Sequence, residues 1–499
     1  MSTARKIFSN TVAQIMGRAV MAGLSIVILK TVATFLTADG SVGGYGQYST
    51  VYEFLAFFGI IADLGLFTIS VREMSKGDRE RSFIFTNILG MRMALAAICM
   101  LLAVVLAFVV PQYQGTFVPM GVVVASFAVF LAIVQGTLSS ALQVEHKMQH
   151  SSMALVLSKL VTMLWMLVTV YVLFKGEAPS QAAFNQLMFA GVAGNLFALL
   201  YTAYFVAKIV PLRPAFDKAY WREIVLTAAP YGFALVLNMV YFRIDGIMLP
   251  VMRGFDEAAY YGPPMRILEI LSVIPVYFMN SMLPVLTSAL RSEEGKAKAK
   301  KMLGLSFDVL FGLGLPVMIG LGLLAYPLIF LIADPDFLSR LDEGVYGSDI
   351  ALQILAVAMF FSYLNSLFNY TLIAVGKQNA LLWINGSACL FNIGVNLWAI
   401  PQFGFRGAAV ATVLTEVFVL LAAAYWSRRF LDFSLNWGRL LKMTLSAGLM
   451  GWMLLLLKEP SYGWLGMQNW NVFFLSGVGA LIYGLGLLVL RALPERRSL

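Results

Sequence analysis

Charged residues are scarce in this sequence. They make up 12% of the chain, whereas a soluble globular protein carries about 25%. Hydrophobic residues fill 60% of the 499 positions. So few charges cannot keep so much apolar surface in water, so the composition excludes an ordinary soluble protein and indicates an integral membrane protein.

Cysteine and histidine are almost absent, which excludes several kinds of site. The two cysteines, Cys99 and Cys389, both fall inside apolar runs, so the chain offers neither a disulfide framework nor a C-x-x-C redox pair. The two histidines, His146 and His150, are four positions apart in EHKMQH, a spacing that could place two metal ligands on one helix face. No third ligand is obvious nearby, so we interpret them as solvated residues of a loop.

A nucleotide-binding loop is also missing. The motif G-x-x-x-x-G-K-[ST], whose backbone would cradle phosphates, occurs nowhere in the chain. We therefore expect no built-in nucleotide motor and no cofactor.

Long apolar runs are abundant. A helix needs roughly 20 mostly apolar residues to span a bilayer, and fourteen such runs occur. They lack the alternation of a barrel wall, so we predict an all-α, polytopic membrane protein. The first run exceeds the core of a signal peptide and is not followed by an A-x-A site, so we expect it to stay in the mature protein. The predicted spans are residues 12–37, 47–70, 83–110, 117–141, 151–174, 183–207, 224–252, 258–290, 302–333, 350–374, 380–400, 405–427, 440–457 and 470–490.

Basic residues are distributed unevenly between the loops. With the N-terminus inside, the inner segments hold 24 lysines and arginines. The outer segments hold five, namely Lys175, Arg253, Arg340, Arg406 and Lys458. This asymmetry predicts that both termini are cytoplasmic. It also accounts for the net charge of +9 through many short loops, so we expect no nucleic-acid partner.

Twelve charged residues remain inside the predicted spans. Each ionised group costs at least about 2.5–3.5 kcal/mol at a helix centre, so such residues normally face a protein interior or a wet cavity. We interpret the set as evidence of a polar path. Structural ion pairs or snorkelling side chains are the alternative, above all for Asp63 and Asp308 near span ends. The twelve are Arg18, Lys30, Arg92, Lys159, Arg243, Arg266, Glu53, Asp63, Asp245, Glu269, Asp308 and Glu416.

Helix geometry sorts two of the charged pairs. Arg243 and Asp245 point about 200° apart on a regular helix, so one of them faces a neighbouring helix or the helix is deformed there. Arg266 and Glu269 are three positions apart and can hold each other on one face. Eight of the seventeen prolines fall between 224 and 333, which predicts bent helices beside a cavity.

The two halves of the chain resemble each other. YGQYSTVYEFL at 45–55 and YGPPMRILEIL at 261–271 share Y-G-x6-E-x-L, and QGTLSSALQVEHKMQ at 135–149 parallels NSLFNYTLIAVGKQN at 365–379. The offset is an even number of spans, which predicts two six-span lobes in parallel orientation. The expected divisions are residues 1–215, 216–430 and 431–499.

Three longer stretches resemble a known family. They are YGQYSTVYEFLAFFGIIADLGL at 45–66, NMVYFRIDGIML with the following EAAYYGPPMRILEIL, and PQFGFRGAAVATVLTE at 401–416. On these the chain is similar, over its whole length, to the Wzx-type oligosaccharide flippases of the multidrug/oligosaccharidyl-lipid/polysaccharide exporter superfamily. The resemblance implies two six-helix lobes facing each other in a V, plus a C-terminal helix pair.

The resemblance also implies a function. Such flippases move an undecaprenyl-diphosphate-linked oligosaccharide from the inner to the outer leaflet of the cytoplasmic membrane, for surface polysaccharides such as O-antigen. The expected partners are that lipid-linked cargo, membrane lipid and a polysaccharide polymerase. Related flippases of lipid-linked peptidoglycan precursor use basic residues on their first and eighth helices, to which Arg18 and Arg266 loosely correspond.

Site residues follow from the cargo and the expected drive. Arginine holds phosphate oxygens with bidentate bonds, so the candidates for head-group binding are Arg18, Lys30, Arg92, Lys159, Arg243 and Arg266. Buried carboxylates are natural sites for a coupling proton or sodium ion, which selects Glu53, Asp245, Glu269 and Glu416.

Two other readings remain open. A drug or metabolite exporter of the same fold is possible, although the excess of cations in the spans favours an anionic cargo. An integral-membrane glycan polymerase would need an acidic extramembrane loop. The longest outer loop, about 334–349, contains Asp334 and Asp336 in DPD, which we interpret as a turn signal.

Overall fold

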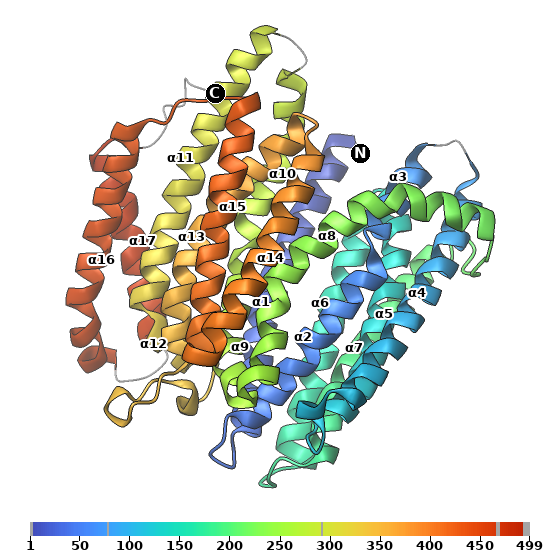
Figure 1. The fold of residues 1–499 in the computed structure, drawn as a ribbon, viewed down its shortest axis with the longest axis horizontal. Helices are drawn as coiled ribbons and strands as arrows, with labels where there is room; N and C mark the ends of the chain where they lie inside the picture. The colour runs from blue at the N-terminus through green and yellow to red at the C-terminus, as the bar shows by residue number, and fades with distance from the viewer. Residues whose placement is uncertain (1–2, 77–78, 291–292, 466–469, 493–499) are drawn as a thin grey trace. The chain divides into compact units, whose positions relative to one another are not determined.

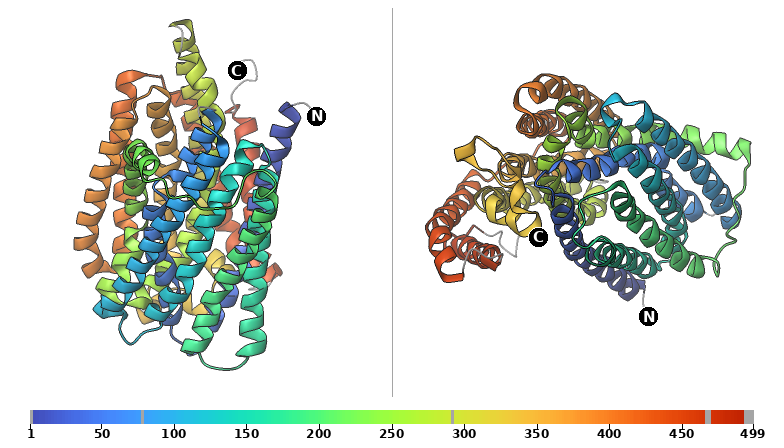
Figure 2. Two further views of the ribbon diagram at one scale, coloured as in Figure 1. Left: turned by 90° about the vertical axis from the view of Figure 1, so that its right-hand side faces the viewer. Right: turned by 90° about the horizontal axis from the view of Figure 1, so that it is seen from below.

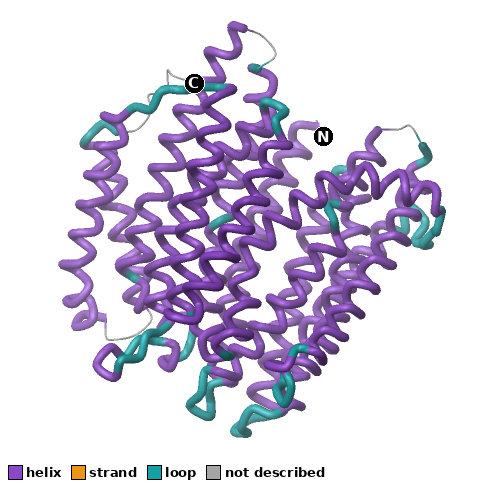
Figure 3. The backbone as a smooth tube through the Cα atoms, viewed as in Figure 1, coloured by secondary structure: helices purple, strands orange, loops and turns teal. Residues whose placement is uncertain are grey.

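The computed structural model describes residues 3–76, 79–290, 293–465 and 470–492. Every regular element in this part of the chain is a helix, and the backbone tube shows helices joined by short loops with no strand (Figure 3). The all-α prediction is therefore confirmed.

Seventeen α-helices are described, together with short 3-10 turns and one π-helical turn, η2, that continues α6. The α-helices are α1 (Thr3–Leu36), α2 (Gly43–Asp63), α3 (Leu66–Lys76), α4 (Arg81–Val109), α5 (Val118–Val144), α6 (Met148–Val168), α7 (Gln181–Val206), α8 (Lys218–Arg253), α9 (Phe255–Leu271), α10 (Val273–Ala289), α11 (Glu293–Leu323), α12 (Ala325–Ile332), α13 (Ser348–Ala374), α14 (Gln378–Phe403), α15 (Phe405–Phe430), α16 (Trp437–Leu465) and α17 (Trp470–Val489).

Each predicted span coincides with one helix or with two consecutive helices. Twelve helical segments of the described chain are long and apolar enough to cross a bilayer, and α1 adds a shorter apolar stretch, Val20–Leu36. The prediction of a multi-pass membrane protein with about fourteen spans is confirmed.

Three predicted spans each divide into two helices. A continuous helix was expected in span two, whereas the prolines predicted bent helices in spans eight and nine. Span two divides into α2 and α3 because Leu64 and Gly65 adopt positive φ values of 43° and 71°, which interrupts the α-helical hydrogen bonding. Span eight divides at Ser272, three residues before Pro275. Span nine divides at Leu324, three residues before Pro327. The backbone nitrogen of proline carries no hydrogen, so it cannot donate to the preceding turn of a helix.

The chain forms two compact units, residues 1–259 and 260–499. In the first unit α5 packs against α7, α4 and α2, while α6 packs against α7 and α1 (Figure 1). The further views in Figure 2 show α4, α5 and α7 as neighbouring long helices. A buried cluster that includes Phe85, Leu142 and Tyr220 fills the space between α3, α4, α5 and the start of α8.

In the second unit α13 is the central helix. It packs against α15, α11, α10 and α12, and α14 packs against α15. The C-terminal pair α16–α17 packs on α11 (Figure 1), where the Tyr483 hydroxyl donates to the Gly312 carbonyl oxygen at 2.7 Å. The expected C-terminal helix pair is present. The divisions at residues 215 and 430, like the V arrangement of the lobes, stay predictions.

Glycines allow α8 and the start of α9 to approach α2 closely in antiparallel register. A Cβ on Gly46 would lie 1.8 Å from the Phe255 carbonyl oxygen, so no other residue fits there without movement of the backbone. Phe255 also packs on the ring of Tyr113, and burial raises the pKa of the Tyr113 hydroxyl. At the other end of α2, Gly232 meets the Leu64 carbonyl oxygen.

Candidate functional site: charged residues within the membrane spans

Glu53 of α2 and Arg243 of α8 form an ion pair in the first unit. The Arg243 Nη1 donates to Glu53 Oε2 at 2.6 Å, and the side chains are 22% and 13% exposed. The antiparallel packing of α2 on α8 brings them together, and a Cβ on Gly246 would lie 3.0 Å from Glu53 Cγ. One predicted head-group ligand and one predicted coupling carboxylate are therefore in direct contact.

Asp245 lies two positions beyond Arg243 and is 2% exposed. Arg243 faces α2, as expected for a residue that cannot share a regular helix face with Asp245. The crossing of α2 and α8 thus gathers Glu53, Arg243 and Asp245, three of the ten predicted site residues, in one part of the first unit.

Arg92 of α4 is buried and forms an ion pair with Asp63, the last residue of α2. Its Nε and Nη1 atoms are buried without a hydrogen-bond partner. Such donors are costly in a low-dielectric interior, because the folded state has not replaced the bonds they would make in water. Arg92 is enclosed by protein in this structure, while the Asp63 side chain is 34% exposed.

Arg266 and Glu269 of α9 form a partly exposed ion pair in the second unit. Arg266 Nη1 donates to Glu269 Oε2 at 2.9 Å, and each side chain is about a third exposed. The local pair predicted from their spacing is confirmed.

Glu416 of α15 is buried, with 3% of its surface exposed. The Asn365 side chain of α13 donates to Glu416 Oε2 at 2.6 Å and also to the Glu416 carbonyl oxygen at 3.0 Å. No cation pairs with this carboxylate within the described residues. At the preceding residue of α15, Asn392 of α14 donates to the Thr415 hydroxyl at 3.1 Å.

The other predicted ligands belong to α1 and α6. Lys30 of α1 and Lys159 of α6 are partly buried on two helices that pack against each other in the first unit. Arg18 belongs to α1, and its side chain lies outside the described residues. The structure therefore pairs Glu53 with Arg243 in the first unit and Arg266 with Glu269 in the second.

Three contacts were missed in the sequence. Asp63 neutralises Arg92, Asn365 binds Glu416, and Arg439 of α16 forms an ion pair with the buried Asp308 of α11. Asp63 and Asp308 were expected to be structural or interfacial residues, which agrees with these pairs. A buried carboxylate needs a hydrogen-bond donor beside it. The position of Glu416 inside an apolar span was therefore the one signal in the sequence that an amide or hydroxyl group lies next to it.

The weaker motifs have structural roles. His146 lies in an exposed turn, as predicted, but the prediction of a solvated loop residue is wrong for His150. His150 belongs to α6, and its ring stacks on Phe205 with 4.0 Å between centroids. Both cysteines are buried. Asp334 and Asp336 flank Pro335 at a short 3-10 turn, as a turn signal predicts. Across the described chain, no group of three or more potential metal ligands of the His, Cys, Asp or Glu type comes together.

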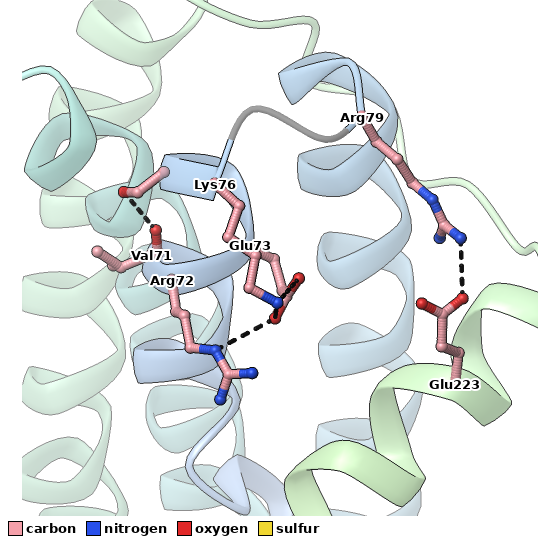
Figure 4. Close-up of polar contacts among 7 residues, drawn as sticks. Val71, Arg72, Glu73, Lys76, Arg79 and Glu223 are labelled. Carbon is pink, nitrogen blue, oxygen red and sulfur yellow. Dashed lines mark hydrogen bonds and ion pairs between the residues drawn. The ribbon is translucent and has the colours of Figure 1, made fainter.

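Charged residues outside the apolar cores tie helix ends together. In Figure 4, Arg72 and Lys76 contact Glu73 on α3, at 3.5 and 2.8 Å, and Arg79 reaches Glu223 of α8 at 3.0 Å. These residues are predicted to be on the inner side of the membrane. The contacts fix the start of α8 to the segment between α3 and α4.

The helices and their buried ion pairs define a multi-pass, all-helical membrane protein. The profile of the polysaccharide biosynthesis protein family matches residues 4–290, more than half of the sequence. The chain belongs to this family, which confirms the resemblance found in the sequence.

Solved structures of two transporter types share the fold. The lipid II flippase MurJ, in an inward closed conformation, matches with a TM-score of 0.72 over 97% of this chain and 99% of that chain, at 14% identity. An inward-facing multidrug resistance MATE family transporter of the MOP superfamily matches with a TM-score of 0.63 over 84% of this chain and 98% of that chain, at 13% identity.

A curated relative is the uncharacterized membrane protein MJ1068 of Methanocaldococcus jannaschii. It is 26% identical over 246 residues, which is 47% of this chain and 45% of that protein. The matched region thus spans about half the length of the curated relative.

Proposed function

We propose that this protein is a flippase that moves an undecaprenyl-diphosphate-linked oligosaccharide from the inner to the outer leaflet of the cytoplasmic membrane. The observation that carries the proposal is the set of arginine–carboxylate pairs inside apolar spans of a polysaccharide biosynthesis protein. A diphosphate and a sugar head group cannot cross hydrocarbon unaided, so a carrier has to provide polar contacts at that depth.

The ion pairs suit an anionic cargo. Without cargo, Glu53 and Glu269 neutralise Arg243 and Arg266, which lowers the cost of holding each cation in the membrane. A diphosphate that reaches either arginine offers two adjacent oxygens to the guanidinium, a geometry that favours bidentate bonds. Exchange of a carboxylate for a phosphate keeps the arginine paired throughout.

Arg92 is the remaining described arginine of the predicted set. Its Nε and Nη1 atoms are buried without a partner, so they have unused capacity to donate to an acceptor, and its partner Asp63 lies at the α2–α3 break. We place it as a residue that meets the head group only when that break rearranges.

The drive is proposed to be a proton or sodium gradient, with no bound cofactor. Glu416 is the leading coupling residue because its carboxylate is buried with an amide partner and no paired cation in the described structure. A proton or a sodium ion on Glu416 would neutralise it, whereas the empty carboxylate carries a desolvation cost. Glu53, Asp245 and Glu269 are secondary candidates.

Reconstitution tests the proposal. Proteoliposomes carrying an undecaprenyl-diphosphate-linked disaccharide are treated outside with an impermeant sugar oxidase, which reports head groups that have reached the outer leaflet. We expect wild-type protein to accelerate exposure above that in protein-free vesicles, and Arg243→Ala with Arg266→Ala to abolish the gain. Unaccelerated exposure, together with gradient-driven transport of an organic cation such as ethidium, would establish the drug-exporter alternative instead.

A further inference from the structure

One sector of the exposed surface of α10 carries polar residues, together with Pro284. It is flanked by the exposed apolar residues Val276 on one side and Ile274 and Val285 on the other. Tyr277, Asn280, Ser281, Thr287 and Ser288 recur at helical spacing, and all but the half-buried Tyr277 are exposed. The buried residues of α10, Pro275, Met279 and Leu286, lie on the opposite side of the helix, against the rest of the second unit.

The first part of this polar stripe, Tyr277 to Ser281, lies inside the apolar segment, while Thr287 and Ser288 are at its end. The segment Phe255–Ala289 is one of the helical segments apolar enough to span the bilayer, and Asn280 is nine residues from its end. An exposed amide in hydrocarbon would lack hydrogen-bond partners at a cost of several kcal/mol, as each unsatisfied polar group does there. Asn280 is therefore better suited to a wet surface at this depth than to contact with acyl chains.

A tyrosine from the central helix completes the stripe. The Tyr370 hydroxyl of α13 donates to Asn280 Oδ1 at 2.9 Å. Two turns earlier on α13, the Tyr363 hydroxyl donates to the Leu271 carbonyl oxygen at 3.0 Å. The two contacts show that α10 and α13 run parallel, and this packing holds Tyr370 beside Asn280. With Oδ1 engaged, the Asn280 amide nitrogen is oriented to donate to a ligand.

From these residues we infer that Asn280 and Tyr370, with the flanking hydroxyls of α10, form a binding site for a neutral sugar ring. Uncharged donors and acceptors match sugar hydroxyls, and the face of a tyrosine ring accepts the C–H face of a pyranose. The charged residues of the preceding helix α9, Arg266 and Glu269, pair with each other and leave no net charge there to select a cation.

The position of Asn280 relative to Arg266 fits a cargo whose sugars are attached to a diphosphate. Asn280 lies fourteen residues beyond Arg266, which corresponds to at most about 21 Å along a helix. This inference rests on the proposed function for the diphosphate end of the cargo, and it adds a separate site for the sugars.

The test compares two lipids on the purified full-length protein in nanodiscs. Undecaprenyl diphosphate and the same lipid bearing a neutral disaccharide are titrated against wild-type protein, Asn280→Leu and Tyr370→Phe. We expect wild-type protein to bind the disaccharide lipid more tightly. Each variant should lose roughly 2- to 10-fold of that affinity, the value of one hydrogen bond, while its affinity for undecaprenyl diphosphate is unchanged. Val276→Ala, at an exposed apolar position of the same helix, is the matched control and should bind both lipids like wild type.

Three results would count against the inference in different ways. Equal affinity of wild-type protein for the two lipids would overturn the sugar site. Full retention of the sugar preference in both variants would overturn it as well. In either case, binding of undecaprenyl diphosphate would leave the flippase proposal standing. Binding of neither lipid by wild-type protein would overturn both. Tyr370→Phe keeps the ring and its packing, so it remains informative if Asn280→Leu fails to fold.

Discussion

At the scale of residues, the charges in the spans are organised as pairs whose members depend on each other. Glu53 and Arg243 are mostly buried, and removal of one partner leaves an uncompensated charge, whereas neutralising both leaves none. Stability and transport should therefore respond differently to single and double substitution.

We predict that Arg243→Ala destabilises the protein by about 3 kcal/mol, the typical cost of breaking a buried pair. The double substitution Glu53→Gln with Arg243→Gln should restore most of the thermal stability but not lipid exposure, because the phosphate ligand is still missing. Thermal unfolding in detergent and the oxidase assay are the two measurements. Recovery of transport in the double variant would show that Arg243 is structural.

Glu416 gives a second residue-level prediction. Glu416→Gln keeps a hydrogen-bonding group beside Asn365 and removes the charge, so the protein should fold normally. Transport in proteoliposomes should lose its response to imposed proton and sodium gradients. Glu145→Gln, which removes the surface partner of Arg81, is the control and should keep that response. A Glu416→Gln protein that still responds fully would exclude Glu416 as the coupling residue.

Only contacts between residues close together in the chain could be predicted from the sequence. The Arg266–Glu269 pair follows from helical spacing, because both partners are on the same face of one helix. The Glu53–Arg243 contact joins positions 190 apart and depends on the antiparallel register of α2 and α8. Asn365 carries no charge, so nothing in its local sequence distinguishes it as the ligand of Glu416.

At the scale of elements, close helix packing depends on a few glycines. Gly46→Ala would push a methyl group into the Phe255 carbonyl, and we expect a loss of about 2 kcal/mol, in the range of overpacked cores. Gly23→Ala on α1 is the matched control: a Cβ there meets nothing within 4 Å, so stability should be unchanged or slightly higher. Thermal unfolding of both variants checks the prediction, and equal stability would contradict it.

The positions of the helices were predictable because hydrocarbon imposes a minimum apolar length on every span. The breaks in spans two, eight and nine were not predicted as such. Leu64 adopts a positive φ that its residue type disfavours, and only its tertiary setting beside Gly232 shows why α2 ends there. The prolines at 275 and 327 did signal deformation, but apolar periodicity continues through both breaks.

At the scale of the whole molecule, the uneven distribution of basic loops predicts the orientation in the membrane. Lys147→Cys should react with a membrane-impermeant maleimide only after the inner side is opened, whereas Lys175→Cys should react in intact cells. The native Cys99 and Cys389 are buried, so we expect neither to react, and the wild-type protein serves as the unlabelled control. Reaction of both introduced cysteines from the same side would contradict fourteen spans with cytoplasmic termini.

The attachment of α16 and α17 has an evolutionary consequence. Arg439 is the counter-charge of Asp308, a carboxylate of α11 that is 2% exposed. A descendant gene that lost its last two helices would leave this acid stranded, so such a shortening could survive only alongside replacement of position 308. Among homologues of different length, the residue at this position should therefore vary together with the presence of the terminal pair.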